Sequence, residues 1–172
     1  MARMRNGPLE IALLLLIALT GCRGEGEPGG NEAAHAGSAP GAPVQTDTLT
    51  GLYESGDGPR RNQMCMIERE EGSTTFGFVT WSSGDTNCSG SGVATRDGKR
   101  LRLVLDGDES CTLEARVDGR RVTFPGTIPA ECNRYYCGTG ARMTGVSFDK
   151  VGGGEADAMR AADLVGDRLC GG

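Results

Sequence analysis

The chain has 172 residues, a formal net charge of -5 at pH 7, 29 glycines and only 5% aromatic residues. It has no basic stripe with interleaved aromatic residues, so the pattern typical of a nucleic-acid partner is excluded. The many glycines and few aromatic residues indicate tight turns and a modest hydrophobic core, in a chain long enough for about one domain.

Residues 1–21 have the pattern of a secretory signal peptide. Arg3 and Arg5 give a basic start, and residues 11–19 form an apolar run. The run is too short to cross a bilayer as a helix, which needs about 20 apolar residues. A basic start, a short apolar run and small residues before a cut are the marks of a signal peptide.

The run ends in Leu19-Thr20-Gly21-Cys22, which resembles the lipobox of bacterial lipoproteins. The resemblance covers only the first 22 residues, and an ordinary signal peptide followed by a chance cysteine is the alternative. It implies cleavage before Cys22 and attachment of lipid, palmitate included, to that residue. Arg23 stands where an Asp would imply retention at the inner membrane. The expected location is therefore the outer membrane, with the protein facing the periplasm.

Residues 22–48 follow as the lipidated cysteine and a tether rich in Gly, Pro and Ala. The segment has no apolar periodicity and cannot offset the entropy cost of ordering, so we expect a flexible linker.

Residues 49–150 read as a β domain. Apolar and polar residues alternate in short runs that are separated by Gly, Asp and Ser. The runs lie at Thr50–Glu54, Gln63–Glu70, Thr75–Trp81, on both sides of two Asp-Gly turns, and at Ala141–Lys150. Seven or eight short strands at this spacing predict a mainly β fold, an antiparallel meander closed into a small barrel.

The two turns, Asp97-Gly98 and Asp118-Gly119, also predict a register. Asp-Gly suits a two-residue hairpin loop in which both central residues have positive φ. This placement predicts the pairs Ala94 with Leu101, Gly92 with Leu103, Leu113 with Phe124, and Ala115 with Val122. Small residues opposite large ones fit a sheet that curves to close.

Six cysteines besides Cys22 predict a disulfide set in an exported chain: Cys65, Cys88, Cys111, Cys132, Cys137 and Cys170. The sequence alone does not choose their pairing. Metal or redox roles are disfavoured, because there is no C-x-x-C and the only histidine, His35, is in the tether. Alternate strands of a meander start at the same end of the barrel. The five cysteines from Cys65 to Cys137 are therefore expected at one mouth of the barrel, with loop 132–137 as a lid.

Residues 151–172 read as a glycine hinge, a short helix and a tail. Acidic residues favour a helix start at Glu155, and an apolar stripe continues it to Leu164. Cys170 is expected to tie the tail back to the domain.

The sequence offers no catalytic site, so we expect a protein that is not an enzyme and needs no cofactor or metal. The folded part has no histidine to act as a base. Asp106, Asp108 and Glu109 leave two less favoured alternatives open, a glycosidase-like carboxylate pair or a calcium site. Their spacing departs from an EF-hand loop.

The best candidate contact surface is Asn133, Arg134, Tyr135 and Tyr136, held between Cys132 and Cys137. Tyr and Arg are enriched at binding hot spots, and a loop fixed by disulfides loses little entropy on binding. In the alternative interpretation, both tyrosines only cover the barrel mouth. Trp81 is expected in the core or at the rim, and Arg60 and Arg61 in a solvated loop.

These features predict a membrane-anchored, non-catalytic binding module with a protein partner in the envelope, or an inhibitor of an exogenous hydrolase. The architecture is similar to lysozyme-inhibitor lipoproteins, to small barrel inhibitors of secreted metalloproteases, and to small envelope lipoproteins of unassigned activity. Gly51-Leu52-Tyr53 resembles the Gly-x-Trp that opens lipocalin-like barrels, with Tyr in place of Trp. A structural or assembly lipoprotein and a carrier of a small apolar ligand are the alternatives. Fold alone does not choose between them.

Overall fold

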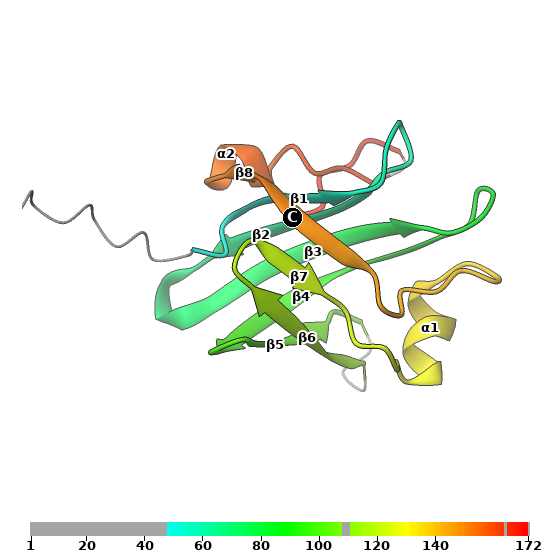
Figure 1. Ribbon diagram of the computed structural model, residues 1–172, viewed down its shortest axis with the longest axis horizontal. Helices are drawn as coiled ribbons and strands as arrows, with labels where there is room; N and C mark the ends of the chain where they lie inside the picture. The colour runs from blue at the N-terminus through cyan, green and yellow to red at the C-terminus, as the bar shows by residue number, and fades with distance from the viewer. Residues whose placement is uncertain (1–47, 108–110, 164, 172) are drawn as a thin grey trace, which may run out of the picture. The chain divides into compact units, whose positions relative to one another are not determined.

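The computed structural model describes residues 48–107, 111–163 and 165–171. The predicted signal peptide, the lipobox and residues 22–47 of the tether lie outside the described residues. Eight antiparallel strands follow one another around a closed barrel in sequence order, which confirms the predicted meander (Figure 1). The strands are β1 (Gly51–Ser55), β2 (Asn62–Glu68), β3 (Ser73–Trp81), β4 (Asn87–Asp97), β5 (Arg100–Leu105), β6 (Thr112–Asp118), β7 (Arg121–Thr123) and β8 (Ser147–Gly153).

Two short α-helices accompany the barrel, α1 (Ala130–Tyr136) between β7 and β8, and α2 (Glu155–Ala158) after β8. A 3-10 turn, Glu70–Gly72, joins β2 to β3. In the part of the chain that the structure describes, neither helix has the length and apolar character needed to cross a membrane.

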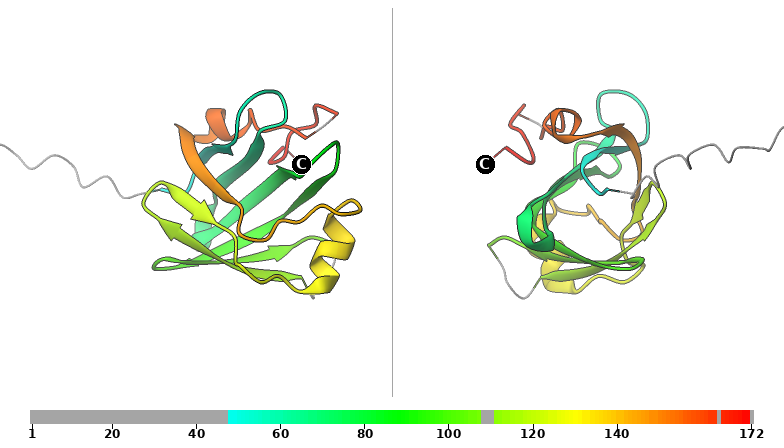
Figure 2. Two further views of the ribbon diagram at one scale, coloured as in Figure 1. Left: turned by 45° about the vertical axis from the view of Figure 1, so that its right-hand side comes forward. Right: turned by 90° about the vertical axis from the view of Figure 1, so that its left-hand side faces the viewer.

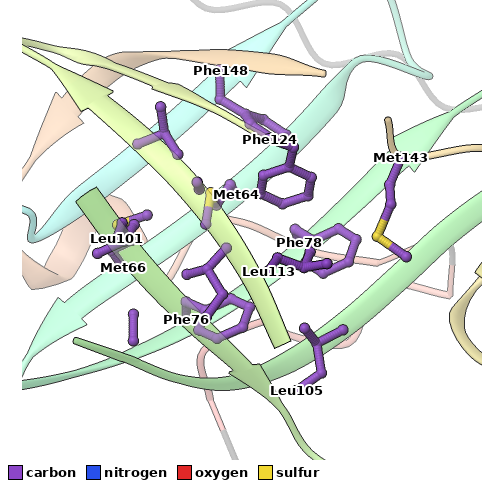
Figure 3. Packing of buried hydrophobic residues seen from close by; sticks show 14 of the residues in the cluster. Met64, Met66, Phe76, Phe78, Leu101, Leu105, Leu113, Phe124, Met143 and Phe148 are labelled. Atoms are coloured by element: carbon purple, nitrogen blue, oxygen red, sulfur yellow. The ribbon is translucent and has the colours of Figure 1, made fainter. Parts of the chain in front are cut away.

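Side chains fill the barrel interior. Inward-facing residues alternate along β5 and β6, where Leu101, Leu103 and Leu113 are at most 1% exposed. The chain's four phenylalanines are also at most 1% exposed. The ring of Phe124 lies 5.1 Å from that of Phe78 and 5.3 Å from that of Phe148, both edge to face. Figure 3 shows these side chains gathered with Met64, Met143 and Leu105 into one packed core.

The predicted register of both hairpins is wrong by two residues. Ala94 pairs with Leu103, and Val122 pairs with Val117. In each turn only the glycine has positive φ, 59° for both Gly98 and Gly119. The glycine is thus the first of the two loop residues, and not the second as predicted. Because side chains alternate with period two, the shift leaves every predicted inward residue on the inner face.

A second hydrophobic cluster lies outside the barrel. Leu52, Cys65 and Ile67 face outward from β1 and β2, and Ala158, Ala161 and Cys170 cover them. A disulfide joins Cys65 to Cys170, which confirms that Cys170 ties the tail to the domain. In Figure 2 the segment after β8, orange to red, lies against the outside of the ring of strands.

Cys65 is therefore not at the barrel mouth, and that part of the prediction is wrong. It is the fourth of the seven residues of β2. Its neighbours Met64 and Met66 point into the core, so the alternation turns Cys65 outward to the C-terminal segment.

Two element boundaries also differ from the prediction. The last strand begins at Ser147 and not at Ala141, because residues 141–146 cross the end of the barrel and bury Ala141 and Met143 in its core. Helix α2 ends at Ala158 and not at Leu164. Beyond it the chain doubles back, and the backbone N–H of Leu169 donates to the carbonyl of Ala161 at 3.0 Å.

Candidate functional site

Helix α1 closes one end of the barrel and is fixed there by two disulfides. Cys132 in the helix is bonded to Cys111 ahead of β6, and Cys137 at the helix end is bonded to Cys88 in β4. These four cysteines gather at one mouth, as predicted. The lid that they hold is a helix and not a loop. Figure 1 shows α1, in yellow, at this end, which we call the α1 end.

The other connections sort between the two ends as an antiparallel meander requires. The β1–β2, β3–β4 and β5–β6 connections lie at the α1 end. The carbonyl of Asn87 accepts the N–H of Gly138 at 2.9 Å, and the hydroxyl of Ser82 accepts the N–H of Arg142 at 3.3 Å. The β2–β3, β4–β5 and β6–β7 turns lie at the opposite end, which we call the turn end.

Local sequence supports a helix of only seven residues at 130–136. Pro129 precedes it with φ -50, and Glu131 in its first turn and Arg134 in its last turn both suit the helix dipole. So short a helix is marginal by itself. The two disulfides hold it on the barrel, and Cys132 is fully buried there.

The two tyrosines of the predicted contact segment have different positions. The hydroxyl of Tyr136 donates to the carbonyl of Asp106 at 2.7 Å, and its ring packs against the core at the barrel mouth. Tyr135 is 62% exposed, and its ring centre lies 4.7 Å from that of Tyr136. The covering role thus fits Tyr136, while Tyr135 presents a large aromatic ring to solvent.

Arg134 borders a hollow of about 300 Å³ between α1 and the chain that follows it. Its lining residues are Asn133, Arg134, Cys137, Gly138, Thr139, Gly140, Ala141 and Arg142. None of them is acidic, and no described carboxylate forms an ion pair with Arg134 or Arg142. We call Arg134, Tyr135 and Arg142 with this hollow the α1 surface. It combines two guanidinium groups with one exposed aromatic ring on a rigid support.

The structure also brings together residues that are far apart in the sequence. Arg60, Arg61 and Trp81 line a hollow of about 420 Å³, together with Arg160 from the C-terminal segment. The guanidinium of Arg60 lies 5.7 Å from the ring centre of Trp81. Trp81 is at the rim, as expected, but the arginines form part of a concave site. No sequence signal near Arg60 points to Arg160, which is a hundred residues away.

Of the carboxylates considered for a calcium or glycosidase site, the structure describes Asp106. Its carboxylate accepts a hydrogen bond from the hydroxyl of Ser91 at 3.1 Å. Asp108 and Glu109 lie outside the described residues, so both alternatives stay predictions. Within the described ranges, no three His, Cys, Asp or Glu side chains come together in a way that could hold a metal ion.

In comparisons with known proteins, no family model, no curated protein and no solved structure matches this chain.

Proposed function

We propose that this protein is a non-catalytic binding module of the cell envelope that contacts a partner protein through the α1 surface. The observation that carries the proposal is Tyr135, 62% exposed on a helix that two disulfides fix to the barrel. An exposed aromatic ring on a rigid support loses little entropy on binding, and Tyr and Arg dominate binding hot spots.

The charge of the α1 surface favours an acidic partner. Arg134 and Arg142 line its hollow without an acidic neighbour in the lining. Guanidinium groups bind carboxylates in a bidentate way, and glycosidase clefts carry paired carboxylates. We therefore propose first that this protein inhibits an exogenous hydrolase.

The filled barrel supports a binding module over a carrier of a small apolar ligand. Phe76, Phe78 and Met64 occupy the centre of the barrel and are fully buried. A carrier of this size would need an empty apolar interior, and eight strands leave a space that side chains can fill.

The first described residue, Thr48, is held at the end of the barrel opposite the α1 surface. Thr48, the first described residue, hydrogen-bonds through its side chain to Glu68 at the end of β2, and its carbonyl accepts the ammonium of Lys150 at 2.6 Å. Both contacts lie at the turn end. A tether that precedes Thr48 would therefore join the barrel at the end opposite α1.

Binding is tested with the oxidised mature chain carrying Cys22→Ser, immobilised and exposed to lysozymes, secreted proteases and envelope extract. We expect a hydrolase to be retained in stoichiometric amount and to lose activity. Arg134→Gln with Tyr135→Ala should weaken its retention by about tenfold or more. Val165→Ala, which trims another exposed apolar side chain, is the matched control.

Equal retention by the double variant and the control would rule out the α1 surface as the contact. Retention of envelope proteins alone, with no loss of hydrolase activity, would replace the inhibitor role with an assembly role.

The lipid anchor is a separate part of the proposal and has its own test. Cys22→Ser removes the thiol to which lipid would be attached, so the protein should move from the membrane fraction to the soluble fraction. Stable anchoring needs more than one acyl chain. All of the proposed lipid is attached to Cys22, so the loss of this residue should release the protein completely. Unchanged membrane fractionation would contradict the anchor.

A further inference from the structure

The hollow beside Trp81 is built from two parts of the chain that covalent and hydrogen bonds hold together. One wall comes from the β1–β2 loop and strands β2 and β3, the other from residues 160–163. The Cys65–Cys170 disulfide joins the two parts. The side chain of Gln63 bridges them, donating to Glu54 at 2.9 Å and accepting the N–H of Ala162 at 3.2 Å.

Three guanidinium groups line this hollow, and carboxylates outside the lining orient them. Arg60 pairs with Asp85 at 2.5 Å, and Arg160 pairs with Asp157 at 2.9 Å. The Nε of Arg61 donates to Glu54 at 2.6 Å. Each guanidinium has five N–H donors. In the described part of the chain, Nη2 of Arg61 and both Nε and Nη1 of Arg160 have no hydrogen-bond partner.

The remaining lining selects among anions. Asp163 is its one acidic residue, and its Oδ1 accepts the N–H groups of Val165 and Asp167 at 3.0 and 2.9 Å. Its other oxygen has no partner among the described residues and is an acceptor for a hydroxyl donor. Trp81 adds an aromatic ring, with the guanidinium of Arg60 at 5.7 Å from its centre, and the backbone N–H of Trp81 donates to the side-chain carbonyl of Asn62 at 2.7 Å.

A ligand that suits this hollow has an anionic group for the arginines, hydroxyl donors for Asp163 and a ring that packs on Trp81. A simple phosphate has no ring to pack on Trp81, and an aromatic carboxylate without a hydroxyl group has no donor for Asp163. A volume of about 420 Å³ is within the range of small-molecule sites, about 300–1,000 Å³. We propose that the hollow formed by Arg60, Arg61, Trp81, Arg160 and Asp163 binds an acidic saccharide, a sugar that carries a carboxylate. This site shares no lining residue with the hollow of the α1 surface and does not depend on a protein partner.

The hollow contains its own reporter, because Trp81 is the only tryptophan of the chain. The experiment titrates the oxidised mature chain carrying Cys22→Ser with trigalacturonate and follows the tryptophan fluorescence. We expect a saturable change that weakens as salt is raised, and no change with the neutral sugar galactotriose. Galacturonate as a monomer distinguishes a free acidic sugar from a chain. Similar affinity for monomer and trimer assigns the site to one sugar residue, and a preference for the trimer assigns it to a chain.

Arg60→Gln with Arg160→Gln should weaken trigalacturonate binding by about tenfold or more. Arg100→Gln with Arg102→Gln removes the same charge from exposed positions on β5 and should leave binding unchanged. All four side chains are more than half exposed, so the fold should tolerate both variants. Equal binding of galactotriose, full competition by inorganic phosphate, or equal losses in the two double variants would overturn the proposal.

Discussion

Gly77 in β3 permits a close contact between the barrel wall and the C-terminal segment. It is buried opposite Cys65 in β2, next to the disulfide to Cys170. A Cβ atom on Gly77 would lie 2.8 Å from the carbonyl carbon of Leu169 and would overlap with its oxygen. The obstacle is backbone and cannot rotate away. Only glycine therefore lets the segment lie flat on the wall at this point.

Gly77→Ala should destabilise the protein by about 1–3 kcal/mol, because the added methyl group forces the segment at Leu169 away from β3. Urea unfolding of the oxidised protein measures the change. Gly153→Ala in β8 is the control, since a Cβ there meets nothing within 4 Å, and its unfolding free energy should stay within about 1 kcal/mol of the original. Equal effects of the two substitutions would show that the close approach to Leu169 has no energetic weight.

At the scale of strands and helices, the sequence predicts which face of a strand is buried better than it predicts which residues pair across neighbouring strands. The inward residues of β5 and β6 follow from alternation alone, because burial has period two in any strand. The exact partners depend on which residue of each turn takes positive φ, and an Asp-Gly pair allows two placements. Gly98 and Gly119 are the residues that decide it.

For helix α1 the sequence does not predict even the type of secondary structure. Seven residues after Pro129 carry too little periodicity to separate a helix from a loop. Cys132 and Cys137 are held by partners in distant segments, and the sequence names no partner for either. The sequence singles out residues 133–136 as a candidate contact segment but does not predict the different positions of Tyr135 and Tyr136. That difference arises from the register of α1 over the mouth.

An ion pair links the short strand β7 to β8 and gives the barrel a pH dependence. Arg121 contacts both carboxylate oxygens of Asp149, at 2.7 and 2.8 Å. The hydrogen bond from Arg121 lowers the pKa of Asp149, so folding favours its ionised form. Its contribution to stability is complete above the unfolded-state pKa, about 3.9, and is lost as pH falls through the lower folded-state pKa.

Asp149→Asn should therefore be less stable than the original protein at pH 5 to 7 by a small amount, as for other exposed ion pairs. The difference should shrink as pH falls below about 3.9. Urea unfolding across this pH range measures it, with Asp57→Asn in the β1–β2 loop as the charge-matched control. A difference that stays constant down to pH 2 would contradict the assigned role. Asp118, whose pKa Lys99 lowers, keeps part of the acid sensitivity in the variant.

The three disulfides of the domain have two different structural roles. Cys88–Cys137 and Cys111–Cys132 hold α1 over the barrel mouth, while Cys65–Cys170 holds the C-terminal segment on the outer wall. A small antiparallel barrel of seven or eight strands follows from the sequence. The pairing of the cysteines does not follow from the sequence. It depends on the C-terminal tail, which packs on the outside of the barrel, and an alternating strand pattern predicts that this outer face is exposed to solvent. The two hollows thus rest on different covalent links.

Replacing Cys65 and Cys170 together by Ser should separate these tasks. The bond closes a loop with a sequence separation of 105 residues, and its loss should lower the unfolding free energy by about 2–5 kcal/mol. The barrel core is a separate cluster that keeps its own two disulfides, so the barrel should remain folded. Trypsin should then cleave the C-terminal segment at Arg160 or Arg168 much faster than in the oxidised original.

Trigalacturonate binding should fall with the displacement of Arg160, while binding through Tyr135 should be unchanged. Replacing Cys111 and Cys132 by Ser should give the reverse pattern. Equal loss of both activities in either variant would show that the two surfaces share one support.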